Sequence, residues 1–178
     1  MESKTPIPPD VATMLLVGIN MDTARLTRGA GKRDLAAHAR CHGVADTSYV
    51  NSILRNHLRI PDLGYFRHAL ENVNYRDRLA WCDFPNGCER NLMGILADFL
   101  LALDEIDFVV LSASNAGRIS FSARSENPNW DASAIMKTAL AGMGHGGGHA
   151  EMAGGVAPDA DRFDAEEFRT RLFSLLGM

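Results

Sequence analysis

Apolar residues recur at helical spacing through the first part of the chain. This pattern, with its glycine, proline and capping residues, predicts helices over residues 9–19, 33–42, 47–58 and 62–72. The first helix is expected to end near Gly18, and Asp46 is placed to cap the third. Residues 1–58 are therefore expected to form a helical unit. A linker helix within residues 59–73 is expected to follow it.

The pattern changes after residue 74, where short apolar and alternating stretches separate the helical ones. Strands are expected over residues 76–84 and 106–111, and over 119–124, where Ile119, Phe121 and Ala123 alternate with polar residues. Helices are expected around residues 92–103, after Asp131, which is placed to cap its helix, and over 164–176. Residues 74–178 are thus predicted to form a mixed sheet flanked by helices, so the fold class is α/β.

Composition indicates an ordinary globular protein with 46% hydrophobic residues. No basic segment precedes an apolar run, and no stretch is long enough to span a membrane, so we expect a cytoplasmic protein without a membrane partner. Cys41, Cys82 and Cys88 lack the spacing of zinc ligands. We expect all three to be reduced thiols.

The net charge of −4 argues against a general surface for duplex DNA. The acidic excess lies in residues 74–178, whereas residues 1–73 are slightly basic. Short single-stranded RNA or DNA, or a small phosphorylated nucleotide, fits this balance better than a long nucleic acid.

The most informative segment is Gly144–Gly155, which places four glycines and two histidines within residues 144–149. So many glycines disfavour a helix or strand interior, so a loop is expected whose bare N–H groups can converge on an anion. His149 would add a donor to a phosphate or sugar. His145 and His149 lack a further ligand at a spacing that would complete a zinc site.

The alternating strand places Ser120, Ser122 and Arg124 on one face. This face is either simply solvated or, with the glycine segment, forms a phosphate clamp. Asp22, which follows the first helix, is by position either a helix-end residue or a metal ligand.

Two motifs together resemble a known superfamily. Ser122-Ala123-Arg124-Ser125, followed by a helix, Gly146-Gly147-Gly148-His149 and Ala153-Gly154, resembles the C-terminal substrate-binding domain of the DHH phosphoesterases. The segment Gly18–Thr23 resembles the one that closes their catalytic domain. The superfamily includes RecJ-like exonucleases, oligoribonucleases that also dephosphorylate phosphoadenosine phosphate (pAp), cyclic-dinucleotide phosphodiesterases and exopolyphosphatase-related proteins.

The resemblance implies roles for particular residues. Asp22 matches a carboxylate ligand of a two-manganese site, where the metals activate water and neutralise phosphoryl oxygens. The substrate-binding candidates, which would hold the nucleotide or terminal phosphate, are Ser122, Arg124, Ser125, His145, Gly146, Gly147, Gly148 and His149.

The chain lacks the other metal-ligand motifs of the superfamily, His-x-Asp-x-Asp and Asp-His-His. It is therefore expected to be the C-terminal portion of a longer protein, either an expressed fragment or a natural truncation, with residues 1–58 as a remnant of the catalytic domain. Mn²⁺ would belong to the full-length parent, and the chain alone is expected to lack phosphoesterase activity.

Partners are expected on the same grounds. The missing N-terminal catalytic half is one, and a second copy of the chain is another, because Leu15, Leu16 and Val17 would be exposed without that half. The alternative function is a stand-alone module that binds nucleic acid or nucleotide, since alanyl-tRNA synthetases carry a related C-terminal domain.

Overall fold

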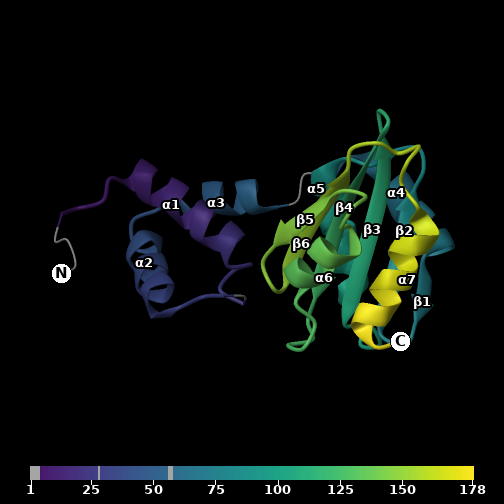
Figure 1. The fold of residues 1–178 in the computed structure, drawn as a ribbon. Helices are drawn as coiled ribbons and strands as arrows, with labels where there is room; N and C mark the ends of the chain where they lie inside the picture. The colour runs from purple at the N-terminus through teal and green to yellow at the C-terminus, as the bar shows by residue number, and fades with distance from the viewer. Residues whose placement is uncertain (1–4, 28, 56–57) are drawn as a thin grey trace. The chain divides into compact units, whose positions relative to one another are not determined.

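The computed structural model describes residues 5–27, 29–55 and 58–178 (Figure 1). The chain folds into two compact units, residues 1–58 and 59–178. Each is described by itself below. Within the described residues, no helix combines the length and the apolar character needed to cross a membrane.

The described residues of the first unit contain three helices: α1 (Pro9–Asp22), α2 (Lys32–His42) and α3 (Thr47–Leu54). Helix α1 packs against both α2 and α3. As the sequence predicts, Asp46 caps α3, because its Oδ1 accepts a hydrogen bond from the Tyr49 N–H at 3.0 Å. The buried residues of this small core are Ala12, Leu16, Val17, Cys41 and Val50.

Three expectations for this unit are wrong. Helix α1 continues past Gly18 to Asp22, and α3 ends at Leu54 rather than at residue 58. Leu16 and Val17 are buried in the core, whereas Leu15 is 48% exposed. The helical rotation of about 100° per residue separates Leu15 from its two neighbours, so an apolar run along one helix does not share one environment.

The second unit is built on a six-stranded sheet with strand order β1-β2-β3-β4-β6-β5. Strands β2 and β3 are parallel and every other neighbouring pair is antiparallel, so the sheet is mixed as predicted. The strands are β1 (Asn74–Arg76), β2 (Leu79–Phe84), β3 (Phe108–Asn115), β4 (Arg118–Ser125), β5 (His145–Gly148) and β6 (Met152–Ala157).

Helices cover both faces of this sheet. Helix α4 (Leu63–Asn72), preceded by a 3₁₀ turn (Ile60–Asp62), packs on one face together with the crossover helix α5 (Arg90–Leu101). Helices α6 (Ala132–Ala139) and α7 (Ala165–Leu176) pack on the other face, the near side of the sheet in Figure 1. The apolar strand β3 lies between the two cores, and Phe108, Val109 and Leu111 are fully buried.

Two segments of this unit differ from what the sequence predicts. The expected strand 76–84 is interrupted by a tight turn at Asp77, whose φ is +51°, and this turn makes a hairpin of β1 and β2. The expected linker helix corresponds to α4, which belongs to the second unit because Ala69 is fully buried in that unit's core.

Candidate functional site

The glycine-rich segment forms a β-hairpin, not the expected loop. Strand β5 pairs with β6 along its whole length, from His145 opposite Val156 to Gly148 opposite Ala153. A tight turn connects them, and the His149 N–H donates to the Met152 carbonyl at 2.7 Å. Low strand propensity is overridden here because the tertiary fold needs backbone without side chains.

Several of these glycines are required for packing. A Cβ on Gly146 would lie 2.6 Å from the Met136 carbonyl oxygen of α6. A Cβ on Gly155 would meet the Leu140 side chain, and Gly148 has a φ of +149° that side chains rarely adopt. Gly146 and Gly155 therefore allow α6 to lie directly on the hairpin, and Gly148 allows the close backbone approach to Met152 and Ala153 within it, so all three have a structural role.

Gly147 has no such explanation. Nothing lies within 4 Å of the position its Cβ would take, and its φ is not in the left-handed region. Because neighbouring residues of a strand face opposite ways, Gly147 faces away from α6, which Gly146 contacts. A glycine at this position leaves bare backbone on an open face, as close approach of a ligand requires.

Small residues continue this face of the sheet across three strands, and it closes toward β4, where Ser122 is 7% exposed. The register places Gly147 of β5 beside Gly154 of β6, and Gly154 beside Ser122 of β4. Ser120 lies two residues before Ser122 and therefore on the same face. Helix α5 packs on β3 and β4 of this side. We call Ser120, Ser122, Gly147 and Gly154 the glycine platform.

Arg90 is the cation placed over this platform, and sequence reasoning missed it. Its Nη2 lies 3.9 Å from the position that a Cβ on Gly154 would take. Arg90 is exposed, and its guanidinium makes no hydrogen bond or ion pair with any residue that the structure describes. Arg90 is also the first residue of α5, where a cation opposes the helix dipole, and that unfavourable placement is the signal that could have identified it.

Arg124 lies two residues after Ser122 on β4, beside the glycine platform, but its guanidinium is not free to bind a ligand. It is 7% exposed, and its Nε donates to Asp98 Oδ1 of α5 at 2.6 Å. Its Nη1 donates to Ser122 Oγ at 3.2 Å and to the Ala123 carbonyl at 3.1 Å. Gly94 makes room for it, since a Cβ there would lie 3.1 Å from Arg124 Nη2. The expected clamp residue is thus buried under α5 and already paired.

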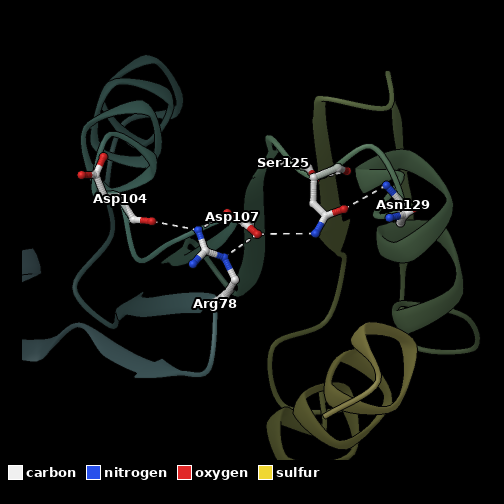
Figure 2. A network of polar contacts seen from close by, with 6 residues as sticks. Arg78, Asp104, Asp107, Ser125 and Asn129 are labelled. Carbon is white, nitrogen blue, oxygen red and sulfur yellow. Dashed lines mark hydrogen bonds and ion pairs between the residues drawn. The ribbon is translucent and has the colours of Figure 1, made fainter.

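Ser125 lies elsewhere. It follows Arg124 on β4 and so faces the opposite side of the sheet, where its Oγ donates to the Asn127 carbonyl at 3.3 Å. Figure 2 shows the polar network it joins, in which Arg78 donates to both carboxylate oxygens of Asp107 and to the Asp104 carbonyl. The Arg78 hydrogen bond lowers the pKa of Asp107 and raises that of Arg78. This network ties the starts of β2 and β3 to the end of β4.

The two histidines lie at opposite ends of β5. Both are exposed, and the two positions are four residues apart, roughly 13 Å along extended backbone. His145 shares the face of Gly147, whereas His149 lies in the hairpin turn. This separation is too large for both side chains to ligate one cation.

Asp22 is exposed at the end of α1 in the first unit. The described residues contain no group of three or more His, Cys, Asp or Glu side chains that could hold a metal ion. The residues of this chain therefore do not fit a two-manganese site by themselves.

The three cysteines are buried and free of disulfides. Burial raises the pKa of both Cys82 and Cys88 to about 11. These two thiols are therefore protonated at neutral pH and are poor nucleophiles.

Comparison with known proteins identifies the family. The sequence model of the DHHA1 domain matches residues 77–173, and the chain belongs to this family. The DHHA1 domain is the C-terminal domain of the DHH superfamily that the sequence motifs resemble. No curated protein matches the chain.

Solved structures share the fold. An exopolyphosphatase-related protein from Bacteroides fragilis aligns with 96% of this chain at 15% identity and a TM-score of 0.73. The chain spans about half of that protein, 51% of its length. The C-Ala domain of alanyl-tRNA synthetase from Aquifex aeolicus aligns over 99% of its own length and 60% of this chain, at 21% identity and a TM-score of 0.50.

Proposed function

We propose that this chain is the substrate-binding, C-terminal portion of a cytoplasmic, manganese-dependent phosphoesterase. Its substrates would be short oligonucleotides, as for an oligoribonuclease or a RecJ-like enzyme, or small nucleotides. Short RNA and pAp are our first choice and cyclic dinucleotides the second. Family membership and the fold shared with an exopolyphosphatase-related protein support the phosphoesterase class.

The observation that carries this proposal is Gly147. Packing explains Gly146, Gly148 and Gly155, whereas Gly147 faces open space beside other small residues of the sheet, where an approaching ligand would meet bare backbone. The bare backbone of the glycine platform would lie against a nucleotide, and Arg90 would neutralise its phosphate. The partly exposed Ser120 adds a neutral hydroxyl donor to the same face, whereas Ser122 is buried and its Oγ accepts a hydrogen bond from Arg124.

Arg124 would act as a positioning residue in this account. Its guanidinium holds the Ser122 hydroxyl and ties β4 to Asp98 of α5, so it fixes the platform's inner edge. His149, in the exposed hairpin turn that follows β5, would donate a hydrogen bond to the ligand.

The metal site would be completed outside this chain. Asp22 is a single carboxylate, and hard divalent cations need several oxygen ligands. Mn²⁺ would activate water and neutralise the phosphoryl oxygens once the missing catalytic half supplies the other ligands. This chain would contribute substrate binding, which holds the scissile phosphate in place.

A direct test is calorimetric titration of the full chain with a 5′-phosphorylated dinucleotide in the absence of metal. We expect micromolar binding that is lost in Gly147→Leu, because the new side chain fills the platform. Gly64→Leu is the matched control, since nothing lies within 4 Å of a Cβ at Gly64 either. Equal affinity of Gly147→Leu and the wild type would contradict the proposal.

Catalysis provides a second test. The chain mixed with Mn²⁺ and either pAp or the dinucleotide should release no phosphate or mononucleotide above the rate without protein. Metal-dependent turnover that a chelator abolishes would show that the chain holds a complete catalytic site and would contradict this part of the proposal.

A second candidate is a stand-alone module that binds nucleic acid or nucleotide. The match across nearly the whole C-Ala domain favours it, because that domain shows this fold inside a different class of protein. A module would bind the dinucleotide equally well with and without a catalytic partner, and no partner would give it turnover.

A further inference from the structure

The first unit contains a pocket that the proposed function does not use. It lies between α1, α2 and α3 and has a cavity volume of about 570 Å³, within the usual range for small-ligand sites. Leu16 and Val50 contribute its apolar part. The basic side chains that line it are Arg25, His38, His42 and Arg55.

The ionisable side chains that line this pocket, among the described residues, are all basic. No Asp or Glu is among its described lining residues. Two carboxylates of the unit are used at helix starts instead, where Asp34 accepts from the Gly31 N–H and Asp46 from the Tyr49 N–H. His38 and His42 lie one helical turn apart with their rings stacked, 5.9 Å between centroids. The described side chains that line the cavity are therefore basic, neutral polar or apolar, and no carboxylate opposes an anion there.

An unusual backbone places Arg25 at this pocket. Ala24, Arg25 and Leu26 have φ values of +45°, +60° and +66°, in the left-handed region that residues with a side chain rarely adopt. The buried Thr23 stabilises the turn, because its Oγ1 donates to the Ile19 carbonyl and accepts from the Leu26 N–H. Strain of this kind persists where surrounding structure enforces it and is concentrated at functional sites.

The turn brings Arg25 to the end of α3. Its Nη2 donates to the Leu54 carbonyl at 3.2 Å, a contact that spans 29 residues of sequence. Arg55 follows Leu54 directly, and its backbone N–H donates to the Asn51 carbonyl at 3.0 Å. Its exposed guanidinium makes no hydrogen bond or ion pair within the described part of the chain. Two guanidinium groups from separate segments thus line the same cavity.

The exposed apolar surface of α1 lies on a different side of that helix from the pocket. Val11, Met14 and Leu15 are each exposed by more than 40% and form one stripe of α1. Leu16 and Asn20, which line the pocket, lie on the opposite side of that helix by the rotation of 100° per residue. A protein partner that covers the apolar stripe would therefore contact another side of α1.

We propose that this pocket binds a phosphate-bearing anion, at a site separate from the glycine platform. Arg25 and Arg55 supply the charge, and guanidinium groups match phosphate oxygens in geometry as well as charge. His38 and His42 supply further donors from the α2 side, and Asn51 adds an amide from α3. The proposal does not depend on the proposed function, because it uses only residues of the first unit.

Pyrophosphate is the probe for this site, and the full chain is titrated in the Gly147→Leu background so that the platform does not contribute. We expect binding that becomes about tenfold weaker in Arg55→Gln and in His38→Gln. Arg33→Gln is the matched control, because it removes one exposed cation of α2 that does not line the pocket, and it should leave the affinity unchanged. Arg25→Gln is also titrated, provided that circular dichroism shows that this variant keeps the helix content of the wild type.

Histidine side-chain NMR provides an independent readout. Pyrophosphate should shift the imidazole signals of His38 and His42 and leave those of His145 and His149 in place. A parallel titration with adenosine monophosphate distinguishes a nucleotide phosphate from a free one. Only a site for nucleotides binds adenosine monophosphate more tightly than pyrophosphate. No pyrophosphate binding, equal affinities of Arg55→Gln and Arg33→Gln, or shifts confined to His145 and His149 would each overturn the proposal.

Discussion

Strands β3 and β5 belong to one sheet but are built from opposite kinds of residue. Strand β3 carries large apolar side chains into cores on both faces, and Phe108, Val109 and Leu111 are fully buried. Strand β5 carries three consecutive glycines, with helix α6 against one face and open space at Gly147 on the other. The two strands therefore differ in what their residues do: β3 stabilises the unit, whereas β5 leaves backbone open at Gly147, where we propose that a ligand binds.

The largest effect should come from the apolar strand. Leu111→Ala removes a side chain buried at 0% exposure and leaves a cavity beneath α5, so the free energy of unfolding should fall by about 3 kcal/mol. Urea denaturation followed by circular dichroism measures it. A loss below about 1 kcal/mol would mean that this core is loosely packed.

The two faces of β5 should respond differently to the same substitution. Gly146→Ala should lower the free energy of unfolding by about 2 kcal/mol, because the new Cβ meets the Met136 carbonyl of α6. Gly147→Ala should change it by less than about 0.5 kcal/mol, because its Cβ enters open space. Equal losses in both variants would show that the open face also serves packing.

Substitutions of Arg90 and Arg124 should differ in their effects on ligand binding and on stability. Arg90→Gln should leave stability unchanged and weaken binding of a 5′-phosphorylated dinucleotide by about tenfold, since this exposed guanidinium has no protein partner among the described residues. Arg124→Gln should destabilise the unit, because it removes the partner of Asp98 and Ser122. Arg162→Gln, a change on the exposed surface, is the control for loss of one charge.

The smallest effect concerns the network that anchors β2 and β3. The pKa of Asp107 is lowered in the folded protein by its hydrogen bonds with Arg78, so its contribution is present above the unfolded pKa of about 3.9. This contribution is lost as the pH falls through the lower folded-state value. Between about pH 5 and pH 2, Asp107→Asn should therefore lose less stability than the wild type. Asp161→Asn, an exposed site, should follow the wild-type curve.

Much of the architecture is predictable from local pattern. The apolar run at Ile106–Leu111 predicts the central strand, and the alternation from Ile119 to Arg124 predicts β4. Asp46 and Asp131 are predicted correctly as caps. These features succeed because burial and capping act over a few neighbouring residues.

The rest depends on tertiary neighbours. Gly146 belongs to a strand because the backbone of α6 lies against it, and no local rule for glycine contains that information. Arg124 looks like an exposed arm in the sequence, but α5 covers it and Asp98 pairs with it. Arg90 stands in no motif, and only the packing of α5 brings it over Gly154.

The most direct test of the glycine platform is a map of backbone amide shifts. Addition of a 5′-phosphorylated dinucleotide to the ¹⁵N-labelled chain should move the amide signals of Gly147, Gly154 and Ser122 most, together with the Arg90 side chain. Signals from α6 on the other face of the hairpin, including those of Ala139 and the C-cap residue Leu140, should move little. Largest shifts within residues 5–55, or no shifts at all at millimolar ligand, would contradict a nucleotide site on this face of the sheet.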